Sequence, residues 1–275
     1  MNKTESALTL LREAAQLQPA AFSSSFGAED MVVLDLIQRD ALPIEIFTLD
    51  TGRLPEETHR LMQRVEERYG PCFKTYFPDA NAVQELVARD GINGFYRSVD
   101  KRKACCAVRK LEPLGRALAG KRAWVTGLRA QQSVTRHDLA RREWDAQWQV
   151  EKFNPLADWS EADVWEYIRR HDVPYNELHD RFYPSIGCAP CTRAITPGED
   201  IRAGRWWWEN ADTKECGLHS KPHSVGVSSE ANVRAAHVKD GAAIAAPSGR
   251  RQNPETEGTV RDVGASADVP VKEIA

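Results

Sequence analysis

Short β-type runs alternate with helical patterns along the first two-thirds of the chain. The runs with strand character lie at 20–25, 44–49, 73–77, 123–128 and 149–154. The segments between them repeat apolar residues at helical spacing and predict helices at 29–39, 55–69, 80–89 and 104–118, and a further helix starts at Ser160, where Asp163 completes a capping box. Such alternation is typical of βα units, and it predicts an α/β fold with a doubly wound parallel sheet covered by helices on both faces.

The pattern fades after His219. Residues 220–275 are biased toward Ala, Ser, Gly and Val and have almost no large apolar side chains. Because such a segment buries too little apolar surface to offset its conformational entropy, we expect a disordered tail. At the other end, residues 1–18 show helical spacing without an apolar signal-peptide core, and no run of the sequence is long enough to span a membrane.

Composition and charge narrow the classes of function. The chain has 275 residues, of which 41% are hydrophobic, enough for one substantial core or two small domains. Its net charge of -3 does not provide the basic field of proteins that bind nucleic-acid polymers, and no membrane partner is expected either. We expect a cytoplasmic protein, and since that compartment is reducing, its six cysteines are better explained as ligands or reactive thiols than as disulfides.

Three turns that follow predicted strands carry polar or glycine-rich sequences. They are SSSFGAED at 23–30, LDTGRLPEET at 49–58 and TGLRAQQSVTR at 126–136. The hydroxyls and backbone N–H groups of the first turn suit an oxyanion, while Arg129 and Arg136 in the third offer planar guanidinium groups. Each turn alone is equally well explained as an ordinary loop, and each Arg as a solvated side chain. Three such turns at successive strand ends favour a ligand site, because ligands of doubly wound sheets bind at the carboxyl ends of the strands.

The cysteines form two pairs. Cys105 and Cys106 are adjacent in a helical pattern, and Cys188 and Cys191 form a C-x-x-C turn. Four thiolates suit one tetrahedral metal ion or a four-iron cluster, and the basic residues in KRKACCAVRK favour the cluster, since they offset its negative charge. A structural zinc ion and, for the C-x-x-C turn, a redox disulfide remain alternatives. We interpret Cys72 as a small buried apolar residue.

Several motifs together resemble those of the assimilatory adenylylsulfate (APS) reductases, the cluster-bearing branch of the sulfonucleotide (APS/PAPS) reductase family. They are SSFGAED, LDTGRLPEET, CCAVRKLEPL, GLRAQQSVTR, KFNPLADWSEADVW, SIGCAPCTR, GRWWWE and KECGLH. The resemblance covers about 20–219 and implies the adenine nucleotide alpha hydrolase-like, Rossmann-like fold. The sequence SFGAED replaces the S-G-G-x-D-S of ATP pyrophosphatases, which argues against ATP cleavage. The branch that reduces phosphoadenylylsulfate (PAPS) typically lacks the cysteine pairs, so their presence points to APS.

The resemblance implies thioredoxin-dependent reduction of adenosine 5'-phosphosulfate to sulfite and AMP in sulfate assimilation. Cys216 would attack the sulfur and form a cysteine S-sulfonate, which reduced thioredoxin or a glutaredoxin-like reductant would discharge. Cys105, Cys106, Cys188 and Cys191 would hold one [4Fe-4S] cluster per subunit. The implied substrate contacts are Ser25, Gly27, Lys110, Gly127, Arg136, Arg202 and Arg205. Among these, Lys110, Arg202 and Arg205 would surround the sulfate. His219 is either an auxiliary group that lowers the thiol pKa or incidental.

The implied organisation is a nucleotide-binding reductase domain with the iron-sulfur site over 1–205, a mobile catalytic segment over 206–219 and the tail over 220–275. The tryptophans at 206–208 either dock that segment or pack as ordinary aromatic residues. Two other functions stay open, a PAPS reductase and a non-catalytic, zinc-organised nucleotide-binding protein. The sequence leaves open whether the chain forms a homo-oligomer.

Overall fold

The computed structural model describes residues 2–132 and 139–210, which all belong to one compact unit of the chain, Met1–His223. They contain a six-stranded sheet in the order β3-β2-β1-β4-β6-β5. Its strands are β1 Ala20–Ser24, β2 Glu45–Leu49, β3 Phe73–Tyr76, β4 Ala123–Val125, β5 Arg142–Asp145 and β6 Val150–Phe153. Neighbouring strands pair in parallel except β5, which lies antiparallel to β6. The doubly wound parallel α/β fold expected from the sequence is therefore confirmed, with one antiparallel edge strand added.

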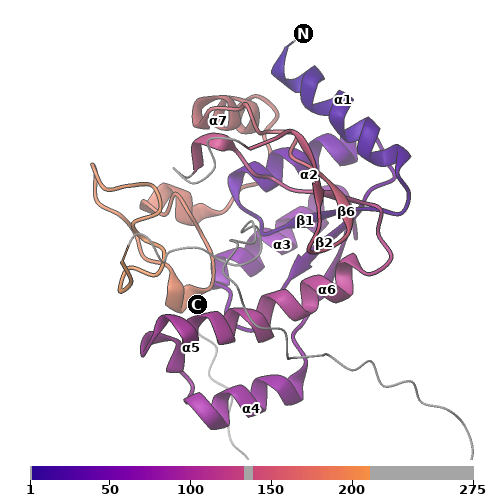
Figure 1. Ribbon diagram of the computed structural model, residues 1–275. Coiled ribbons are helices and arrows are strands. Elements are labelled where there is room, and N and C mark those ends of the chain that lie inside the picture. Colours follow the sequence, from indigo (N-terminus) through magenta and orange to yellow (C-terminus); the bar gives the residue numbers. More distant parts are fainter. Residues whose placement is uncertain (1, 133–138, 211–275) are drawn as a thin grey trace, which may run out of the picture. The chain divides into compact units, whose positions relative to one another are not determined.

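Helices cover both faces of this sheet (Figure 1). They are α1 Lys3–Gln16, α2 Ala28–Arg39, α3 Glu56–Tyr69, α4 Ala80–Asp90, α5 Val99–Cys106, α6 Glu112–Leu118 and α7 Glu161–Arg170. Single turns of other helix types lie at η1 Gly94–Tyr96, η2 Ala107–Leu111, η3 Ala130–Gln132, η5 Glu177–Arg181 and η6 Ala189–Cys191.

The core has two parts, one on each face of the sheet. On one face, Phe22 and Val125 pack with buried residues of α1, α2, α3 and α7. On the other, Ala21 and Trp124 pack against α6. Neighbouring residues of one strand thus point to opposite faces, as the pleat requires, and a buried parallel sheet with continuous apolar strands results.

Two local predictions can be checked in detail. The capping box at the start of α7 is present, since the Ser160 N–H donates to Asp163 Oδ2 at 2.6 Å and the Asp163 N–H donates to Ser160 Oγ at 3.2 Å. The single helix expected at 104–118 is wrong in detail, because α5, a π-helical turn and α6 occupy this stretch. Pro113 has no N–H to donate to the Arg109 carbonyl, so the α-helical ladder is interrupted before it.

The strand order creates a topological switch point between β1 and β4. From β1 the chain adds β2 and β3 on one side, and from β4 it adds β6 and β5 on the other. At such a point the loops from the carboxyl ends of the two central strands diverge, and a crevice opens between them. The first and third predicted turns follow β1 and β4, so both border this crevice.

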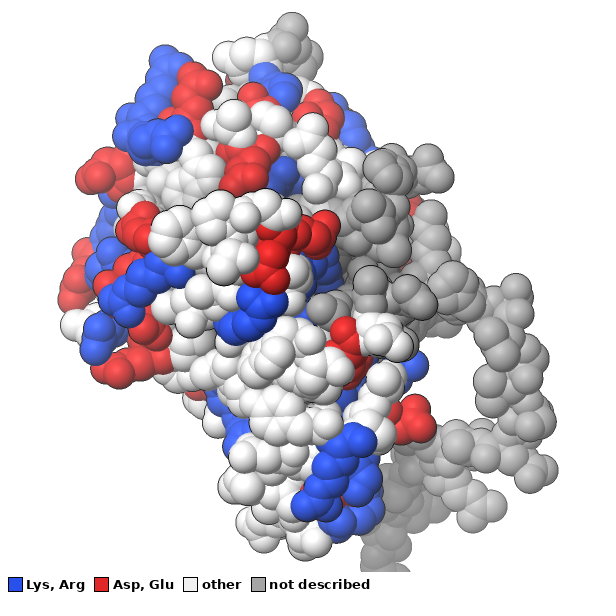
Figure 2. All heavy atoms as spheres, turned by 90° about the vertical axis from the view of Figure 1, so that its left-hand side faces the viewer, with Lys and Arg blue, Asp and Glu red and all other residues white. Residues whose placement is uncertain are grey.

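Charged side chains are mostly interspersed on the face drawn in Figure 2, where Lys and Arg lie among Asp and Glu. Within the described residues of that face no broad basic surface of the kind that binds nucleic-acid polymers is seen. Among the helices of the described ranges, none is both long and apolar enough to cross a membrane. The predicted tail at 220–275, and most of the predicted catalytic segment, lie outside the described residues.

Candidate active site

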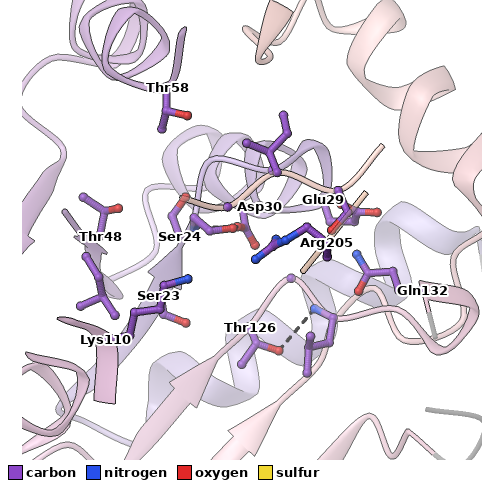
Figure 3. A pocket seen from close by; sticks show the side chains of 18 of the residues that line it. Ser23, Ser24, Glu29, Asp30, Thr48, Thr58, Lys110, Thr126, Gln132 and Arg205 are labelled. Carbon is purple, nitrogen blue, oxygen red and sulfur yellow. Dashed lines mark hydrogen bonds between the residues drawn. The ribbon is translucent and has the colours of Figure 1, made fainter. Parts of the chain in front are cut away.

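A cavity of about 250 Å³ opens at the switch point between β1 and β4. Side chains from the ends of β1, β2 and β4 converge on it, and Lys110 and Arg205 enter from other parts of the chain (Figure 3). The sequence-predicted substrate residues that line this cavity are Ser25, Gly27, Lys110, Gly127, Arg202 and Arg205. The structure thus brings these residues, which are scattered over much of the sequence, to one site.

The serine-rich turn is held by Asp30 in the first turn of α2. Asp30 Oδ2 accepts hydrogen bonds from both the backbone N–H and the hydroxyl of Ser25, each at 2.7 Å. Burial raises the pKa of Asp30 to about 6, although the hydrogen bonds from Ser25 act in the opposite direction. Gly127 lies against the same carboxylate, and a Cβ atom at 127 would lie 2.1 Å from Asp30 Oδ1. The turns after β1 and β4 therefore touch through Asp30, and only glycine fits at 127.

Arg129 is neither of the two things the sequence suggested, a solvated surface residue or a ligand contact. It is 2% exposed, and its Nε donates to Glu29 Oε1 at 2.7 Å. The guanidinium group is therefore neither a solvated surface group nor part of the cavity lining. Its ion pair fixes the third turn to the start of α2, next to the Asp30 contact.

The cationic end of the cavity depends on a tight approach between two loops. Gly187 faces Arg205 so closely that a Cβ atom at 187 would lie 2.3 Å from Arg205 Nη2. The guanidinium carbon of Arg205 lies 4.8 Å from the ring centroid of Trp206, which is 1% exposed. Lys110 comes from the π-helical turn that follows α5. The Arg205 guanidinium is thus positioned by packing against Trp206 and by the space that Gly187 leaves in the opposite loop.

The cysteines surround a second, smaller cavity of about 20 Å³. Its lining contains Cys105, Cys106, Cys188 and Cys191 together with Arg53, Arg102, Arg109, Lys110 and Arg205. Burial and, to a smaller extent, the neighbouring Cys188 raise the pKa of the Cys191 thiol to about 12. Burial likewise raises the pKa of Cys105, while Arg109 lowers it. Without a bound cation, the raised pKa values favour the protonated thiols of Cys105 and Cys191.

The C-x-x-C turn is fixed by the turn that follows β2. The Ala189 N–H donates to the Arg53 carbonyl at 2.8 Å, and Thr51 Oγ1 lies 3.2 Å from Cys188 Sγ. On the other side, the Tyr96 hydroxyl donates to the Pro190 carbonyl at 2.7 Å. The second predicted turn therefore positions the cysteines as well as lining the cavity, a role that sequence analysis missed.

The donor set can be tested against a metal group. In the described part of the chain, no three His, Cys, Asp or Glu side chains converge as they would on a single metal ion. Instead the four thiols border a shared cavity, and all its charged lining residues are cations. Four thiolate donors ringed by Lys and Arg suit an anionic cluster of several atoms. Arg102 and Arg109 belong to the basic KRKACCAVRK motif that the sequence analysis linked to the cluster, whereas Arg53 had not been assigned to this site.

Cys72 lies elsewhere, half-buried against the main core, and burial raises the pKa of its thiol. The remaining sequence-predicted site residues, Arg136, Cys216 and His219, lie outside the described residues. The chain that leads toward Cys216 and His219 nevertheless starts from a defined place, because the Trp206 N–H donates to the Cys191 carbonyl at 3.2 Å. The tryptophan triplet therefore starts beside the cysteines.

Comparison with known proteins identifies the family of this chain. A family model described as "Phosphoadenosine phosphosulfate reductase domain" matches residues 19–194. The chain is 64% identical over 206 residues to the adenosine 5'-phosphosulfate reductase of Allochromatium vinosum, covering 75% of this chain and 80% of that protein. It is 58% identical over 198 residues to the adenosine 5'-phosphosulfate reductase of Burkholderia cepacia, covering 72% of this chain and 79% of the relative.

The fold is shared with a solved phosphoadenylyl-sulfate (PAPS) reductase from Candida auris. That structure superimposes with a TM-score of 0.59 at 29% identity, and the match covers 69% of this chain and 90% of the other. With the family model spanning more than half of the sequence, the chain belongs to the phosphoadenosine phosphosulfate reductase domain family.

Proposed function

We propose that this protein reduces adenosine 5'-phosphosulfate (APS) to sulfite and AMP in sulfate assimilation. Relatives named adenosine 5'-phosphosulfate reductase, at up to 64% identity, support the reaction. The observation that carries it is that Lys110, Arg205 and Trp206 line both the switch-point cavity and the cysteine cavity. These residues form a shared wall, with the two cations Lys110 and Arg205, between the nucleotide-sized cavity and the cavity bordered by four thiols.

The charges of the cavity match the ends of the substrate. APS carries its negative charge on the phosphate and the sulfate, and a thiolate can approach the sulfur only when that charge is offset. Lys110, Arg202 and Arg205 supply this offset at one end. At the other, the hydroxyls of Ser23 and Ser24 line the cavity and can donate to the nucleotide, beside the Ser25 turn that Asp30 holds. Arg136 is assigned to the nucleotide by resemblance alone.

Cys216 is the proposed nucleophile. Its thiolate attacks the sulfur of APS, the S–O bond to AMP breaks, and a cysteine S-sulfonate forms. A thiolate of reduced thioredoxin then attacks the Cys216 sulfur and expels sulfite, and the second thioredoxin thiol resolves the mixed disulfide. Both electrons come from the dithiol, which becomes a disulfide. The cytoplasm, which keeps thiols reduced, suits this cycle.

Cys105, Cys106, Cys188 and Cys191 are the proposed ligands of one [4Fe-4S] cluster. When bound, the cluster would tune the electrostatics of the shared wall, since the thiol route already supplies both electrons. Three neighbouring residues position the C-x-x-C turn that carries Cys188 and Cys191. Arg53 and Tyr96 hold the C-x-x-C turn through its backbone, and Thr51 contacts Cys188. These contacts fix two of the ligands relative to the substrate cavity.

Sulfite release decides the function. Anaerobically purified protein is incubated with reduced thioredoxin and either APS or PAPS, and sulfite and nucleotide products are measured. We expect sulfite and AMP from APS, with kcat/KM at least about tenfold above that for PAPS. A preference for PAPS would replace the substrate by its 3'-phosphorylated relative. Absence of sulfite from both would favour the non-catalytic nucleotide-binding alternative.

A further inference from the structure

An exposed apolar patch lies next to the point where the described chain leads toward Cys216. We define the patch as Ile92, Tyr96 and Trp207, which are 66%, 40% and 40% exposed. The Tyr96 and Trp207 ring centroids lie 6.2 Å apart. Among the described residues six large apolar side chains are exposed, and this patch holds half of them. Isolated exposed apolar residues are ordinary, whereas a group of them marks an interaction site.

The patch is built on a rigid base. Trp208 packs edge-on against Tyr96, with ring centroids 4.5 Å apart, and Phe95 contacts both rings. Arg53 donates to the Ile92 carbonyl at 3.1 Å and lies 5.2 Å from the Phe95 centroid, so Ile92 is tied to the same base. Exposed aromatic side chains that already pack against neighbouring rings, as Tyr96 does, lose little entropy on contact, which suits them to protein docking.

Covalent geometry limits where a partner of Cys216 can sit. Cys216 follows Asn210 by six residues, so its Cα lies within about 20 Å of Asn210 in any conformation. Trp207 precedes Asn210 by three residues, which keeps it within about 11 Å. Cys216 therefore stays within about 31 Å of Trp207, so the surface around Trp207 lies within reach of a protein whose thiol attacks Cys216.

We infer that Ile92, Tyr96 and Trp207 form the docking surface for the dithiol protein that discharges Cys216. This inference rests on the proposed function and extends it to the partner's binding site. The patch lines neither cavity, and although the Tyr96 hydroxyl also holds the Pro190 carbonyl, Ile92 and Trp207 can be changed without removing that contact. Exposed polar residues that flank it in the sequence, Asn93, Arg97 and Asn210, supply the polar rim usual at such interfaces.

The two half-reactions test this surface. Protein with the variants Ile92→Glu or Trp207→Ala is first loaded by APS without reductant, and the Cys216 adduct is quantified by mass spectrometry. Sulfite release is then followed after adding reduced thioredoxin or, separately, dithiothreitol. In both variants, we expect the rate of adduct formation and the rate of sulfite release by dithiothreitol to stay within about twofold of the parent. The rate of sulfite release by subsaturating thioredoxin should fall about tenfold or more.

Trp144→Ala is the matched control, because Trp144 is 59% exposed but lies on the edge strand β5, and it should discharge like the parent. Unchanged thioredoxin discharge in both patch variants would overturn the docking site. Slowed loading would show that the patch contacts the chain's own residues 211–219. A changed oligomeric state with normal discharge would show that it contacts a second copy of the protein. Either result would also overturn the docking site for the dithiol protein. A parent that never acquires the adduct refutes the proposed chemistry itself, and the docking site with it.

Discussion

Arg102 and Glu209 form a buried, bidentate ion pair that joins the cysteine-bearing helix α5 to the chain leading toward Cys216. Arg102 Nε and Nη2 donate to the two carboxylate oxygens of Glu209 at 2.9 and 2.8 Å. The two side chains are only 1% and 3% exposed. The Arg102 guanidinium carbon also lies 4.7 Å from the Trp206 ring centroid, and that of Arg205 lies 4.8 Å from the same centroid. The ion pair therefore fixes the residues that separate the two cavities.

The first prediction is that Glu209→Gln strongly destabilises the fold. Removing the carboxylate takes the charged, bidentate partner from the buried Arg102 guanidinium, and breaking a buried pair in this way costs about 3–5 kcal/mol. Urea unfolding should show this loss as a lower midpoint with an unchanged slope. The matched control is Glu56→Gln, which removes the exposed ion pair between Glu56 and Arg60 and should cost less than about 1 kcal/mol. Equal losses would show that Glu209 contributes no more than a surface charge.

The second prediction concerns pH. Burial raises the pKa of Asp30 from 3.8 to about 6, so the folded state binds this proton more tightly than the unfolded state. The tighter proton binding by Asp30 therefore adds to the free energy of unfolding. This contribution is fully present below about pH 4 and is lost as the pH rises through 6. The shift corresponds to roughly 3 kcal/mol, from 1.36 kcal/mol per pKa unit.

The variant Asp30→Asn isolates this effect, because asparagine does not titrate. The free energy of unfolding should be measured from pH 4 to 7 for both proteins without ligand. The parent should lose stability relative to Asp30→Asn over this range, whatever other groups titrate in both proteins. Parallel pH profiles would show that Asp30 has an ordinary pKa.

Much of the fold and part of the site follow from local sequence. Strands and helices were predictable because buried parallel strands need continuous apolar runs and the helices need apolar residues at helical spacing. Gly127 was recognisable because a glycine after a strand signals close approach, and Asp30 makes that approach. The short strand β5 was missed, since its residues alternate between exposed and half-buried and include few apolar side chains.

Other features depend on contacts between distant residues, which leave no local pattern. Thr51 lies 137 residues before the Cys188 thiol that it contacts, so the turn after β2 carries no sign that it positions cysteines. Arg129 lies 100 residues after Glu29, and without that partner a buried guanidinium was not predictable. Helices, strands and turns are determined largely by residues that are close in the sequence. Whether a charged side chain is buried depends instead on the partner that the fold brings to it from a distant part of the sequence.

The third prediction is that each of Cys105, Cys106, Cys188 and Cys191 is needed for iron. Anaerobically purified parent protein should be brown and contain about four iron and four sulfide per chain. Replacing any one of these cysteines by serine should lower both, because each thiol borders the same cavity. Cys72→Ser is the matched control and should keep the parent content, since Cys72 packs on the core.

Metal and sulfide analysis separates the alternatives. Stoichiometric zinc without labile sulfide in the parent would replace the cluster by a structural metal ion. A Cys106→Ser protein with full iron would remove Cys106 from the ligand set while leaving the other assignments intact.

The last prediction is that Gly187→Ala impairs turnover through Arg205. Gly187 does not have a positive φ, so alanine strains no backbone there, but its Cβ would lie 2.3 Å from Arg205 Nη2. The guanidinium group must shift from its present position in the cavity lining, and losing one such charge-stabilising group costs about 10²-fold in kcat. Iron content and folding should stay near the parent's. If Gly187 acts only through Arg205, the double variant Gly187→Ala/Arg205→Ala should be no slower than Arg205→Ala alone, because coupled positions are not additive. Losses that multiply in the double variant would show instead that the glycine serves another contact.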